Sequence, residues 1–404
     1  MNSTLEDIVR SGLCHGCGGC AASLPTGRIK LQMNEAGFLR PQACVPLSRT
    51  DHDSVIAVCS GNSMEHSRGL TFDPIWGPLV AVRTGYAADA AVRFAGSSGG
   101  VISALLIHLL ETGVVDSIWH TVADPADPFG NTVQRSKTRQ EILAAAGSRY
   151  APSSPLTHLE RCLEREGRFA FVGKPCDVAT LRRMGERDRR IGEKIPVMIS
   201  FMCAGIPSRN AVLRIPEAMG ASAQDVTAFA FRGEGWPGYA RALLRDGRKL
   251  QMGYNESWGK ILSRHLQFRC KICPDGTGEF ADIVCADAWF GKDGYPDFEE
   301  RPGRSLILTR SPTGEKLLQS ALGCEAVMSE ACAKDAIKGM QPYQYDRKRS
   351  VLARIAALMV TGREHPRFVR MGLWRAALRG SPLLLARNFA GTLRRLFQNK
   401  VDFR

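Results

Sequence analysis

The spacing of apolar residues predicts a chain built from alternating helices and strands. Residues 98–113 (SGGVISALLIHLLETG) have the pattern of an apolar helix, and residues 114–123 (VVDSIWHTVA) follow as a strand. A second strand, residues 168–173 (RFAFVG), leads through the loop KPCD into a charged helix at 178–190. Residues 195–203 (IPVMISFMC) predict a buried strand, followed by the loop AGIPS and another helix. Strands that alternate with helices predict an α/β fold with a mostly parallel sheet.

Three segments have other patterns. Residues 1–65 are rich in cysteine and glycine with little periodicity, which is typical of a small module held by a metal. Residues 226–252 contain short alternating runs with Gly and Pro, which predict an antiparallel insert. From about residue 350 the chain has a basic, helical pattern, interrupted by Gly380 and Pro382. We therefore divide the chain into a small module at 1–65, a core in two parts at 75–160 and 161–344, and a basic helical tail at 345–404.

Composition indicates a globular protein with a sizeable core, because 44% of the 404 residues are apolar. The chain has no run of 18 uncharged apolar residues, and its first residues, MNSTLEDIVR, lack the regions of a secretory signal. We therefore expect a cytoplasmic protein without a transmembrane helix. Disulfides are disfavoured in that compartment, so metal ligation or redox chemistry has to account for many of the 13 cysteines.

The net charge of +14 is concentrated in the tail. Residues 345–404 contain 14 Lys/Arg against 3 Asp/Glu, a net charge of +11, and the remaining chain is nearly neutral. This distribution argues against a basic groove for nucleic acid, and no RNA-binding aromatic motif accompanies the tail. Two roles stay open for the tail: contact with an anionic membrane surface, or packing on the protein's own body or on a partner subunit.

Cys14, Cys17 and Cys20 have the two-residue spacing of a bacterial ferredoxin run. The ferredoxin pattern would continue with a cysteine before Pro25, where this chain has Leu24. In a two-cluster ferredoxin that cysteine binds the other cluster, so one [4Fe–4S] site remains and needs a remote fourth ligand. Cys59 and Cys44 are the two candidates, and we favour Cys59. Zinc bound by the same thiolates is the alternative.

A second set of cysteines is scattered along the core. Cys176 and Cys203 each follow a predicted strand, where open α/β sheets place their binding sites. Cys270 and Cys273 form a C-x-x-C pair. Together the four residues could bind a cluster, although the pair alone is equally compatible with zinc.

Three further segments contain candidate binding residues. The small residues at 95–100 run into the predicted apolar helix, whose N-terminus offers free amides to a phosphate; a tight helix start against a sheet is the plain alternative. Arg149 could pair with phosphate and Tyr150 could stack on a flat ring, or both could lie in an ordinary loop. Asp282, Asp287 and Trp289 close a short apolar strand, where the acids could bind a ribose or cap a helix.

From Cys14 to Trp289 the chain resembles the beta subunits of coenzyme F420-reducing hydrogenases and dehydrogenases. The resemblance rests on LCHGCGGC, SSGGVISALL, GSRYAP, VGKPCDVATLR, FMCAGIPS and CKICPDGTGEFADIVCADAW, in the order that the family has them. The chain departs from the family pattern at Ala286, where glycine is usual, at Arg149, where lysine is usual, and at Ser60, where the motif Cys-Pro-Gly has proline.

The resemblance implies two [4Fe–4S] clusters and one FAD. The first cluster would be bound by Cys14, Cys17, Cys20 and Cys59, and the second by Cys176, Cys203, Cys270 and Cys273. The flavin would lie in the core, at 75–160 and beyond, against Ser97, Ser98, Gly99, Gly100, Ser148, Arg149, Tyr150, Asp287 and Trp289. Coenzyme F420 is then a candidate substrate.

The sequence thus favours an iron–sulfur flavoprotein oxidoreductase that moves electrons between an organic two-electron partner, FAD and the clusters. Its partners would be a small redox substrate, a ferredoxin or a partner redox subunit, with the tail on the inner membrane surface if it binds lipid. Two alternatives stay open: an electron-transfer subunit without turnover alone, and a zinc-stabilised binding protein.

Overall fold

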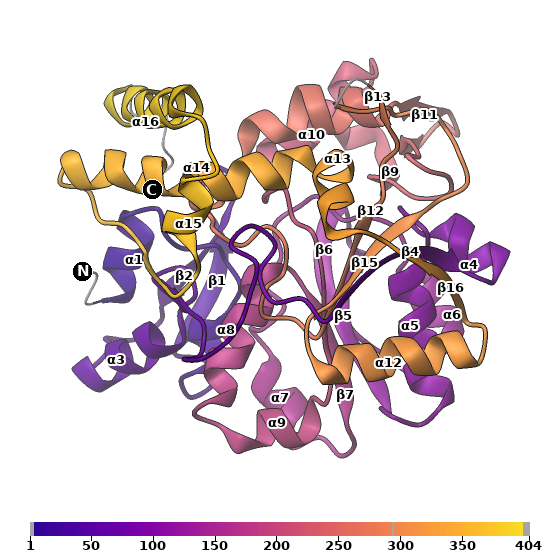
Figure 1. Cartoon of the computed structure of the whole chain (residues 1–404), viewed down its shortest axis with the longest axis horizontal. Coiled ribbons are helices and arrows are strands. Elements are labelled where there is room, and N and C mark those ends of the chain that lie inside the picture. Colours follow the sequence, from indigo (N-terminus) through magenta and orange to yellow (C-terminus); the bar gives the residue numbers. More distant parts are fainter. Residues whose placement is uncertain (1–3, 293–294, 399–404) are drawn as a thin grey trace.

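The computed structural model describes residues 4–292 and 295–398, and its centre is one eight-stranded sheet (Figure 1). From edge to edge the strands are β16 (Val327–Ala331), β4 (Ala81–Ala87), β15 (Ser305–Thr309), β12 (Ile283–Asp287), β8 (Met198–Phe201), β7 (Phe169–Gly173), β5 (Ser117–Asp124) and β6 (Asp127–Ser136). Only the inner run from β12 to β5 is parallel, and all other neighbours pair antiparallel. The α/β class is confirmed, but the sheet is mixed rather than mostly parallel. β6 follows β5 by a short turn, and β15 follows β12 through residues 288–304, whose described part contains no crossover helix.

Helices cover both faces of this sheet, which explains the nearly continuous apolar strands. On one face lie α5 (Val101–Glu111), α6 (Arg139–Ala144) and α12 (Pro312–Gly323), packed on Ile118, Ile199 and Ile307. On the other lie α7 (Leu159–Glu164), α8 (Pro175–Gly185) and α9 (Arg189–Lys194), packed on neighbouring strand positions such as Trp119 and Met198. Successive strand residues therefore enter opposite cores.

Several predicted elements are confirmed with shifted ends, and one is wrong. The segment KPCD is not a loop: α8 begins at Pro175, and Cys176 lies in its first turn. Proline is favourable at this first position because its missing N–H has no intrahelical partner there. The Asp177 carboxylate accepts a hydrogen bond from the backbone N–H of Lys174 (2.9 Å), which completes the helix start.

The N-terminal segment has more regular structure than its weak periodicity suggests. It contains α1 (Leu5–Arg10), α2 (Gly19–Ala22), β1 (Ile29–Met33), β2 (Leu39–Ala43), α3 (Arg49–Val58) and β3 (Ser63–Glu65). Reciprocal capping boxes begin α1 and α3, at Thr4 with Asp7 and at Ser48 with Asp51. Local caps and the cysteine-bearing turns, rather than a long apolar face, define this module.

The predicted antiparallel insert is confirmed as a three-stranded sheet, β9 (Val226–Ala230), β10 (Ala240–Leu244) and β11 (Lys249–Met252). It shares an apolar cluster with α10 (Arg209–Ala218). A π-helical turn at Asn255–Ile261, a 3₁₀ turn at Leu262–His265 and α11 (Phe268–Lys271) lead back to the central sheet. The remaining short elements are α4 (Ala90–Ala95), the 3₁₀ turns Ala223–Asp225 and Lys334–Ala336, β13 (Gly291–Lys292), β14 (Tyr295–Pro296) and α13 (Ile337–Met340).

The C-terminal tail packs on the N-terminal module. It consists of α14 (Pro342–Val360), β17 (Arg367–Val369), α15 (Leu373–Ala377) and α16 (Pro382–Phe397), with the expected break before Pro382. Val351, Ile355 and Leu358 of α14 share an apolar cluster with Ile8 and Leu13. β17 adds to β3 as a parallel strand, and Figure 1 shows the tail helices beside α1. The last six residues of the predicted tail, 399–404, lie outside the described residues.

None of the helices described is both long and apolar enough to cross a lipid bilayer.

Candidate functional site

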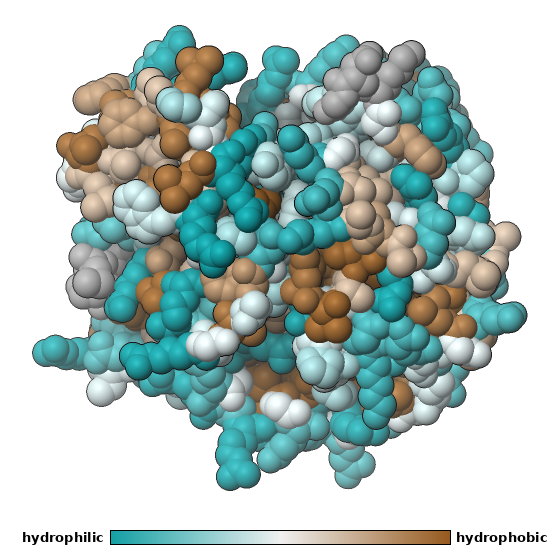
Figure 2. Space-filling model, in the orientation of Figure 1, coloured by the Kyte–Doolittle hydropathy of each residue, from teal (hydrophilic) through white to brown (hydrophobic). Residues whose placement is uncertain are grey.

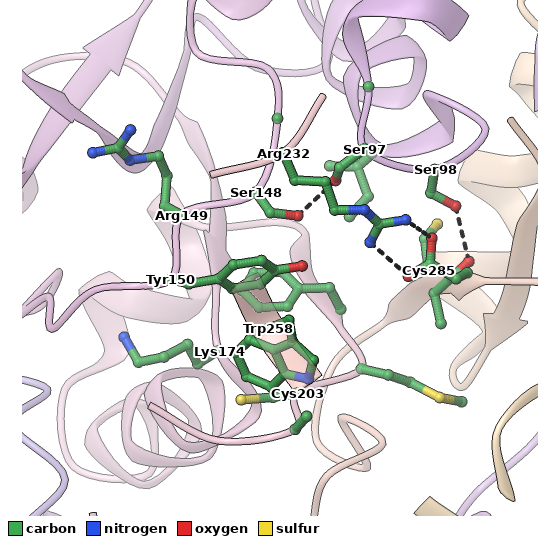
Figure 3. A pocket seen from close by; sticks show the side chains of 18 of the residues that line it. Ser97, Ser98, Ser148, Arg149, Tyr150, Lys174, Cys203, Arg232, Trp258 and Cys285 are labelled. Atoms are coloured by element: carbon green, nitrogen blue, oxygen red, sulfur yellow. Dashed lines mark hydrogen bonds and ion pairs between the residues drawn. The ribbon is translucent and has the colours of Figure 1, made fainter. Parts of the chain in front are cut away.

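A cavity of about 620 Å³ opens at the carboxyl ends of β7, β8 and β12. Its wall includes the first turn of α5, the loop 145–151, the loop 202–207 and the π-helical turn (Figure 3). This is the edge of a sheet where α/β proteins place ligands, and the volume lies within the range of small-molecule and cofactor sites. The fold therefore brings distant segments to one concave site.

The two small-residue segments predicted to bind a cofactor meet in this wall. The Ser148 hydroxyl donates a hydrogen bond to Ser97 Oγ (2.7 Å), as drawn in Figure 3. Gly100 caps the N-terminus of α5 in the left-handed region (φ +71°), and an added Cβ would lie 2.5 Å from the Val92 carbonyl oxygen. Only glycine fits this turn, which aims the start of an 11-residue helix at the cavity.

Ser98 and Gly99 hold this segment against the sheet. The Ser98 hydroxyl is within hydrogen-bond distance of the carbonyl oxygens of Ala286 (3.2 Å) and Arg304 (3.0 Å). The Gly99 N–H donates to Ser305 Oγ (2.9 Å), so this amide already has a partner inside the protein. Their contacts make both residues anchors of the binding segment.

Arg149 and Tyr150 have different orientations. The Arg149 guanidinium donates to Asn131 Oδ1 (2.8 Å) and to the Gly130 carbonyl (2.6 Å), and Figure 3 shows it directed away from the other labelled side chains. Burial lowers the pKa of Arg149 to about 10. The Tyr150 ring lies 4.7 Å from the Trp258 ring, centroid to centroid, at the cavity wall. Arg149 thus supports the loop, and Tyr150 presents a flat surface.

Asp287 is paired with an arginine that the sequence pattern did not single out. Arg232 donates to both carboxylate oxygens, with N–O distances of 2.9 and 2.7 Å, and the Trp236 indole N–H donates to the same carboxylate (2.7 Å). The Trp236 and Trp289 rings stack at 4.8 Å, and the guanidinium lies over Tyr254 and Trp289. Although burial opposes its charge, the Asp287 carboxylate holds the pKa of Arg232 above its usual range. This buried pair forms one wall of the cavity.

The first predicted set of cysteines is brought together. Burial raises the pKa of the Cys20 thiol, and repulsion from Cys14, Cys17 and Cys59 raises it further, so the four sulfur atoms lie near one another. Cys44, the alternative fourth residue, is exposed. The described geometry therefore groups Cys59, rather than Cys44, with Cys14, Cys17 and Cys20, which we call the triple run.

Backbone amides point at two of these sulfurs. The N–H groups of Gly16 and Gly19 each lie 3.4 Å from a sulfur, Cys14 Sγ and Cys17 Sγ respectively. Gly16 has φ +77°, and an added Cβ would lie 2.8 Å from the Leu39 carbonyl oxygen. Amides that face thiolates stabilise negative charge on sulfur, which is a feature of cluster environments.

The second predicted set is also brought together. Burial raises the pKa of the Cys203 thiol to about 12, with repulsion from Cys270 and Cys273 adding to the shift. Burial, followed by repulsion from Asp177 and then from Cys203 and Cys270, raises the pKa of the Cys176 thiol. The Ile206 N–H donates to Cys270 Sγ at 3.3 Å. Cys203 also lines the cavity, so this set and the cavity share a wall.

Two buried cations flank the second set. Lys174, in the cavity wall, donates to Ser153 Oγ (2.8 Å) and pairs with the Asp177 carboxylate (2.7 Å). Arg347 of α14 donates to the carbonyl oxygens of Cys203 (2.7 Å) and Cys270. The tail therefore supplies a fixed positive charge beside the cysteines.

Sequence reasoning missed Arg232, Lys174, Trp258 and Arg347. Lys174 carried a signal, since a lysine directly after a buried strand and before Pro-Cys has to have a partner. Arg232 comes from the antiparallel insert, Trp258 from the π-helical turn after it, and Arg347 from the tail. Only the tertiary structure brings these residues to the site.

Comparison with known proteins identifies the family. The family model for the N-terminal part of the coenzyme F420 hydrogenase/dehydrogenase beta subunit matches residues 82–160, and the model for its C-terminal part matches residues 166–348. Among curated relatives, one subunit of the F(420)H(2) dehydrogenase of Methanosarcina mazei is 24% identical over 322 residues, which are 78% of this chain and 84% of the relative.

Two further relatives show the breadth of the family. Coenzyme F420-dependent sulfite reductase of Methanocaldococcus jannaschii is 25% identical over 82% of this chain and 49% of its own length. The 7-hydroxymethyl chlorophyll a reductase of rice is 23% identical over 55% of this chain and 46% of its own length. The chain thus spans about half the length of these two relatives.

A solved structure shares the fold. A chain of the F420-reducing [NiFe] hydrogenase complex from Methanosarcina barkeri superposes with a TM-score of 0.57 at 18% identity, over 74% of this chain and 98% of that one. The two family models together cover the central sheet, the cavity and the second set of cysteines. The chain belongs to the family of coenzyme F420 hydrogenase/dehydrogenase beta subunits, which are components of oxidoreductases.

Proposed function

We propose that the protein is an iron–sulfur flavoprotein oxidoreductase, with FAD in the cavity and one [4Fe–4S] cluster on each set of four cysteines. FAD exchanges two electrons or a hydride with an organic partner, and thiolate-bound clusters carry one electron at a time. The observation that carries the proposal is the shared wall: Cys203 belongs to the second set and lines the cavity. A flavin in the cavity would therefore lie against the second set.

The cavity wall fits a flavin nucleotide. The start of α5 and the hydroxyls of Ser97 and Ser148 would hold phosphate, while Tyr150 and Trp258 would hold a flat ring. The Lys and Arg side chains in the described wall, Lys174, Arg149 and Arg232, already have protein partners. We therefore assign phosphate binding to amides and hydroxyls, with Gly100 shaping the turn and Ser98, Gly99 and Arg149 holding these segments in place.

The donor sets fit iron–sulfur clusters. Each set consists of four thiols, and in each set backbone N–H groups face sulfur. In the triple run, Gly16 and Gly18 adopt the left-handed conformation (φ +77° and +85°), which lets the loop turn tightly between successive cysteines. Zinc on the same thiols is the alternative for both sets.

Enzymatic turnover by this chain alone is the second part of the proposal. Several relatives are named as subunits of F420-dependent dehydrogenases or hydrogenases. An electron-transfer subunit that needs a partner redox subunit or a ferredoxin is therefore the main alternative. Coenzyme F420 is one candidate substrate, because it stands in the names of these relatives.

The deciding experiment is anaerobic purification followed by iron, zinc and flavin counts per chain and an absorption spectrum. We expect eight irons, one FAD and broad visible absorption. Stoichiometric zinc without iron or flavin would refute the oxidoreductase. The loaded protein is then assayed with an artificial electron donor and with reduced F420; electron transfer only after addition of a partner would identify the subunit role.

We also propose that the protein is cytoplasmic and that its tail holds it against the inner, anionic surface of the membrane. Four large apolar side chains of the tail are more than 70% exposed: Trp374, Leu378, Leu383 and Phe397. Exposed arginines, including Arg387 and Arg394 of α16, separate them. Figure 2 shows brown and tan patches gathered over the corner that α14, α15 and α16 form in Figure 1. Protein interfaces have few charges at their centre, whereas an interfacial membrane helix mixes single apolar anchors with basic residues.

A further inference from the structure

Ser60 lies fully buried at the point where the two sets of cysteines meet. It follows Cys59 of the first set directly in the chain. Its hydroxyl donates a hydrogen bond to the backbone carbonyl of Cys176, a member of the second set (2.9 Å). One side chain therefore joins the turn that carries one set to the helix start that carries the other.

Two more contacts use the remaining capacity of this hydroxyl. Ser60 Oγ lies 2.8 Å from His15 Nε2 and 2.8 Å from Thr180 Oγ1. A hydroxyl donates one hydrogen bond and accepts two, so the contact to Cys176 and these two saturate it. His15 lies between Cys14 and Gly16, and Thr180 Oγ1 is 3.7 Å from Cys17 Sγ, so both partners belong to the surroundings of the first set.

The ligand atoms of His15, Cys176 and Asp177 provide an independent measure of this proximity, because they lie within 4.8 Å of one another. His15 comes from the ferredoxin-like run, whereas Cys176 and Asp177 begin α8. The two sets are therefore adjacent, with the Ser60 hydroxyl in the same buried junction.

Two side chains near Cys270 of the second set also contact this junction: Arg269 of α11 and Gln267, which precedes the helix. Arg269, next to Cys270, donates to the carbonyl oxygens of Ser60 (3.1 Å) and Gly61 (3.0 Å). The Gln267 amide lies 3.5 Å from the His15 carbonyl and 3.6 Å from Cys270 Sγ. Arg269 and Gln267 are 2% and 1% exposed, so these contacts form away from solvent.

We infer that Ser60 is the positioning residue that fixes the first set of cysteines against the second. The inference rests on the proposed function for its redox meaning. If each set held a cluster, the residues between them would separate two one-electron carriers; electron transfer between the carriers would move no atom, and a reduced flavin in the cavity would be the electron source. Ser60 would then fix the distance and orientation between the two carriers.

The test uses the full-length, cluster-loaded protein and three variants. Ser60→Ala removes the hydroxyl, and Thr180→Val removes one of its partners. Ser23→Ala is the matched control, because the Ser23 hydroxyl donates to the Cys20 carbonyl (3.0 Å) beside the first set and, within the described part of the chain, makes no hydrogen bond to the second. Electron paramagnetic resonance of the fully reduced protein measures the magnetic interaction between the clusters, and iron analysis measures their content.

We expect Ser60→Ala and Thr180→Val to keep eight irons but to lose or change the splitting that arises from the interaction. Ser23→Ala should match the parent. Because Ser60 and Thr180 act through one network, the double variant should show no greater change than Ser60→Ala alone. An unchanged splitting in both single variants would overturn the inference while leaving the proposed function intact. If Ser60→Ala fails to load iron, Thr180→Val decides: parental splitting there overturns the inference. A parent protein without two clusters would refute the proposed function instead.

Discussion

Arg232 and Asp287 form a bidentate ion pair in the cavity wall, with N–O distances of 2.9 and 2.7 Å, although they lie 55 positions apart in the sequence. The Arg232 side chain is 2% exposed and that of Asp287 is 17% exposed. The indole N–H of Trp236 adds a third donor to the carboxylate. Three donors thus hold the carboxylate inside the protein, which makes Asp287 the support of Arg232.

Asp287→Asn should destabilise the protein by about 3 kcal/mol, because it leaves the buried Arg232 guanidinium without its countercharge. Urea unfolding of the flavin-free protein measures the free energy of unfolding. Glu160→Gln, which breaks the exposed pair with Arg190, should cost less than about 1 kcal/mol. An equal decrease in the free energy of unfolding in the two variants would show that the Arg232–Asp287 pair stabilises the protein no more than an exposed pair does.

Replacing any one of Cys14, Cys17, Cys20 or Cys59 by serine should lower the iron content by about one cluster, because three thiolates do not complete the cage. Cys44→Ser should leave iron unchanged, since Cys44 is exposed. Iron and acid-labile sulfide analyses measure the result. Loss of iron from the Cys44 variant together with full retention in the Cys59 variant would reverse the assignment of the fourth ligand.

Serine variants of Cys176, Cys203, Cys270 and Cys273 should all lose the same spectroscopic signal and keep that of the first set. The control is Cys285→Ala, because Cys285 is buried and lines the cavity but is not one of the four thiols proposed to bind the cluster. Electron paramagnetic resonance after stepwise reduction separates the two signals. Four variants with unrelated spectra, or zinc bound at 270 and 273, would contradict the assignment of these four cysteines to one cluster.

Tyr150→Ala should weaken FAD binding about fivefold, because an aromatic contact contributes about 1 kcal/mol beyond its buried area. Fluorescence titration of flavin-free protein measures the dissociation constant. The control is Tyr239→Ala, a 41% exposed tyrosine of the insert that does not line the cavity. An unaltered dissociation constant would remove Tyr150 from the flavin site.

Neutralising three exposed tail arginines, Arg387, Arg394 and Arg395, by glutamine should lower binding to phosphatidylglycerol-containing vesicles about 100-fold, at about 1 kcal/mol for each basic residue. Co-sedimentation at low and high salt measures binding. The control changes Arg161, Arg187 and Arg189, which are exposed on or beside α7 and α9, to glutamine. Equal binding by the two triple variants, or none by the parent, would leave the tail as a packing element. A chain truncated at Gln344 is unsuitable for this test, because it would also lose the buried Arg347 and Lys348.

Local patterns predicted the parts of the protein that depend on neighbouring residues. The apolar run at 98–113 predicted α5 with shifted ends, and the strands at 168–173 and 195–203 were recognised. The spacing of Cys14, Cys17 and Cys20 predicted one shared site, and Cys20 lies close enough to the other two thiols for their repulsion to raise its pKa. Reasoning from the residues already favoured Cys59 over Cys44 as the partner of Cys14, Cys17 and Cys20. It left Cys176, Cys203, Cys270 and Cys273 open between a cluster and zinc, and the family resemblance then implied both sets. The α/β class followed from the alternation of elements, but the antiparallel edges of the sheet did not.

The rest depends on contacts that no short window of sequence contains. Arg347 reads as one basic residue in a basic tail, yet it donates to the Cys203 and Cys270 carbonyls. Arg149 looked available for phosphate, but Gly130 and Asn131 engage its guanidinium. Whether a charged side chain is free or paired is decided by tertiary structure, which composition and spacing do not encode.

The contact between the tail and the N-terminal module determines when the module is completed during synthesis. Arg370 donates to the His66 carbonyl (2.6 Å) across 304 positions, and β17 pairs with β3 beside it. Ribosomes add roughly 5–20 residues per second, so the first cysteines leave the ribosome roughly 18–70 s before the strand that pairs with β3. During that interval α1 and the Cys14 turn lack their apolar partners on α14. Iron delivered to the first set before release of the chain would meet an open module, so cofactor insertion there is expected to follow translation.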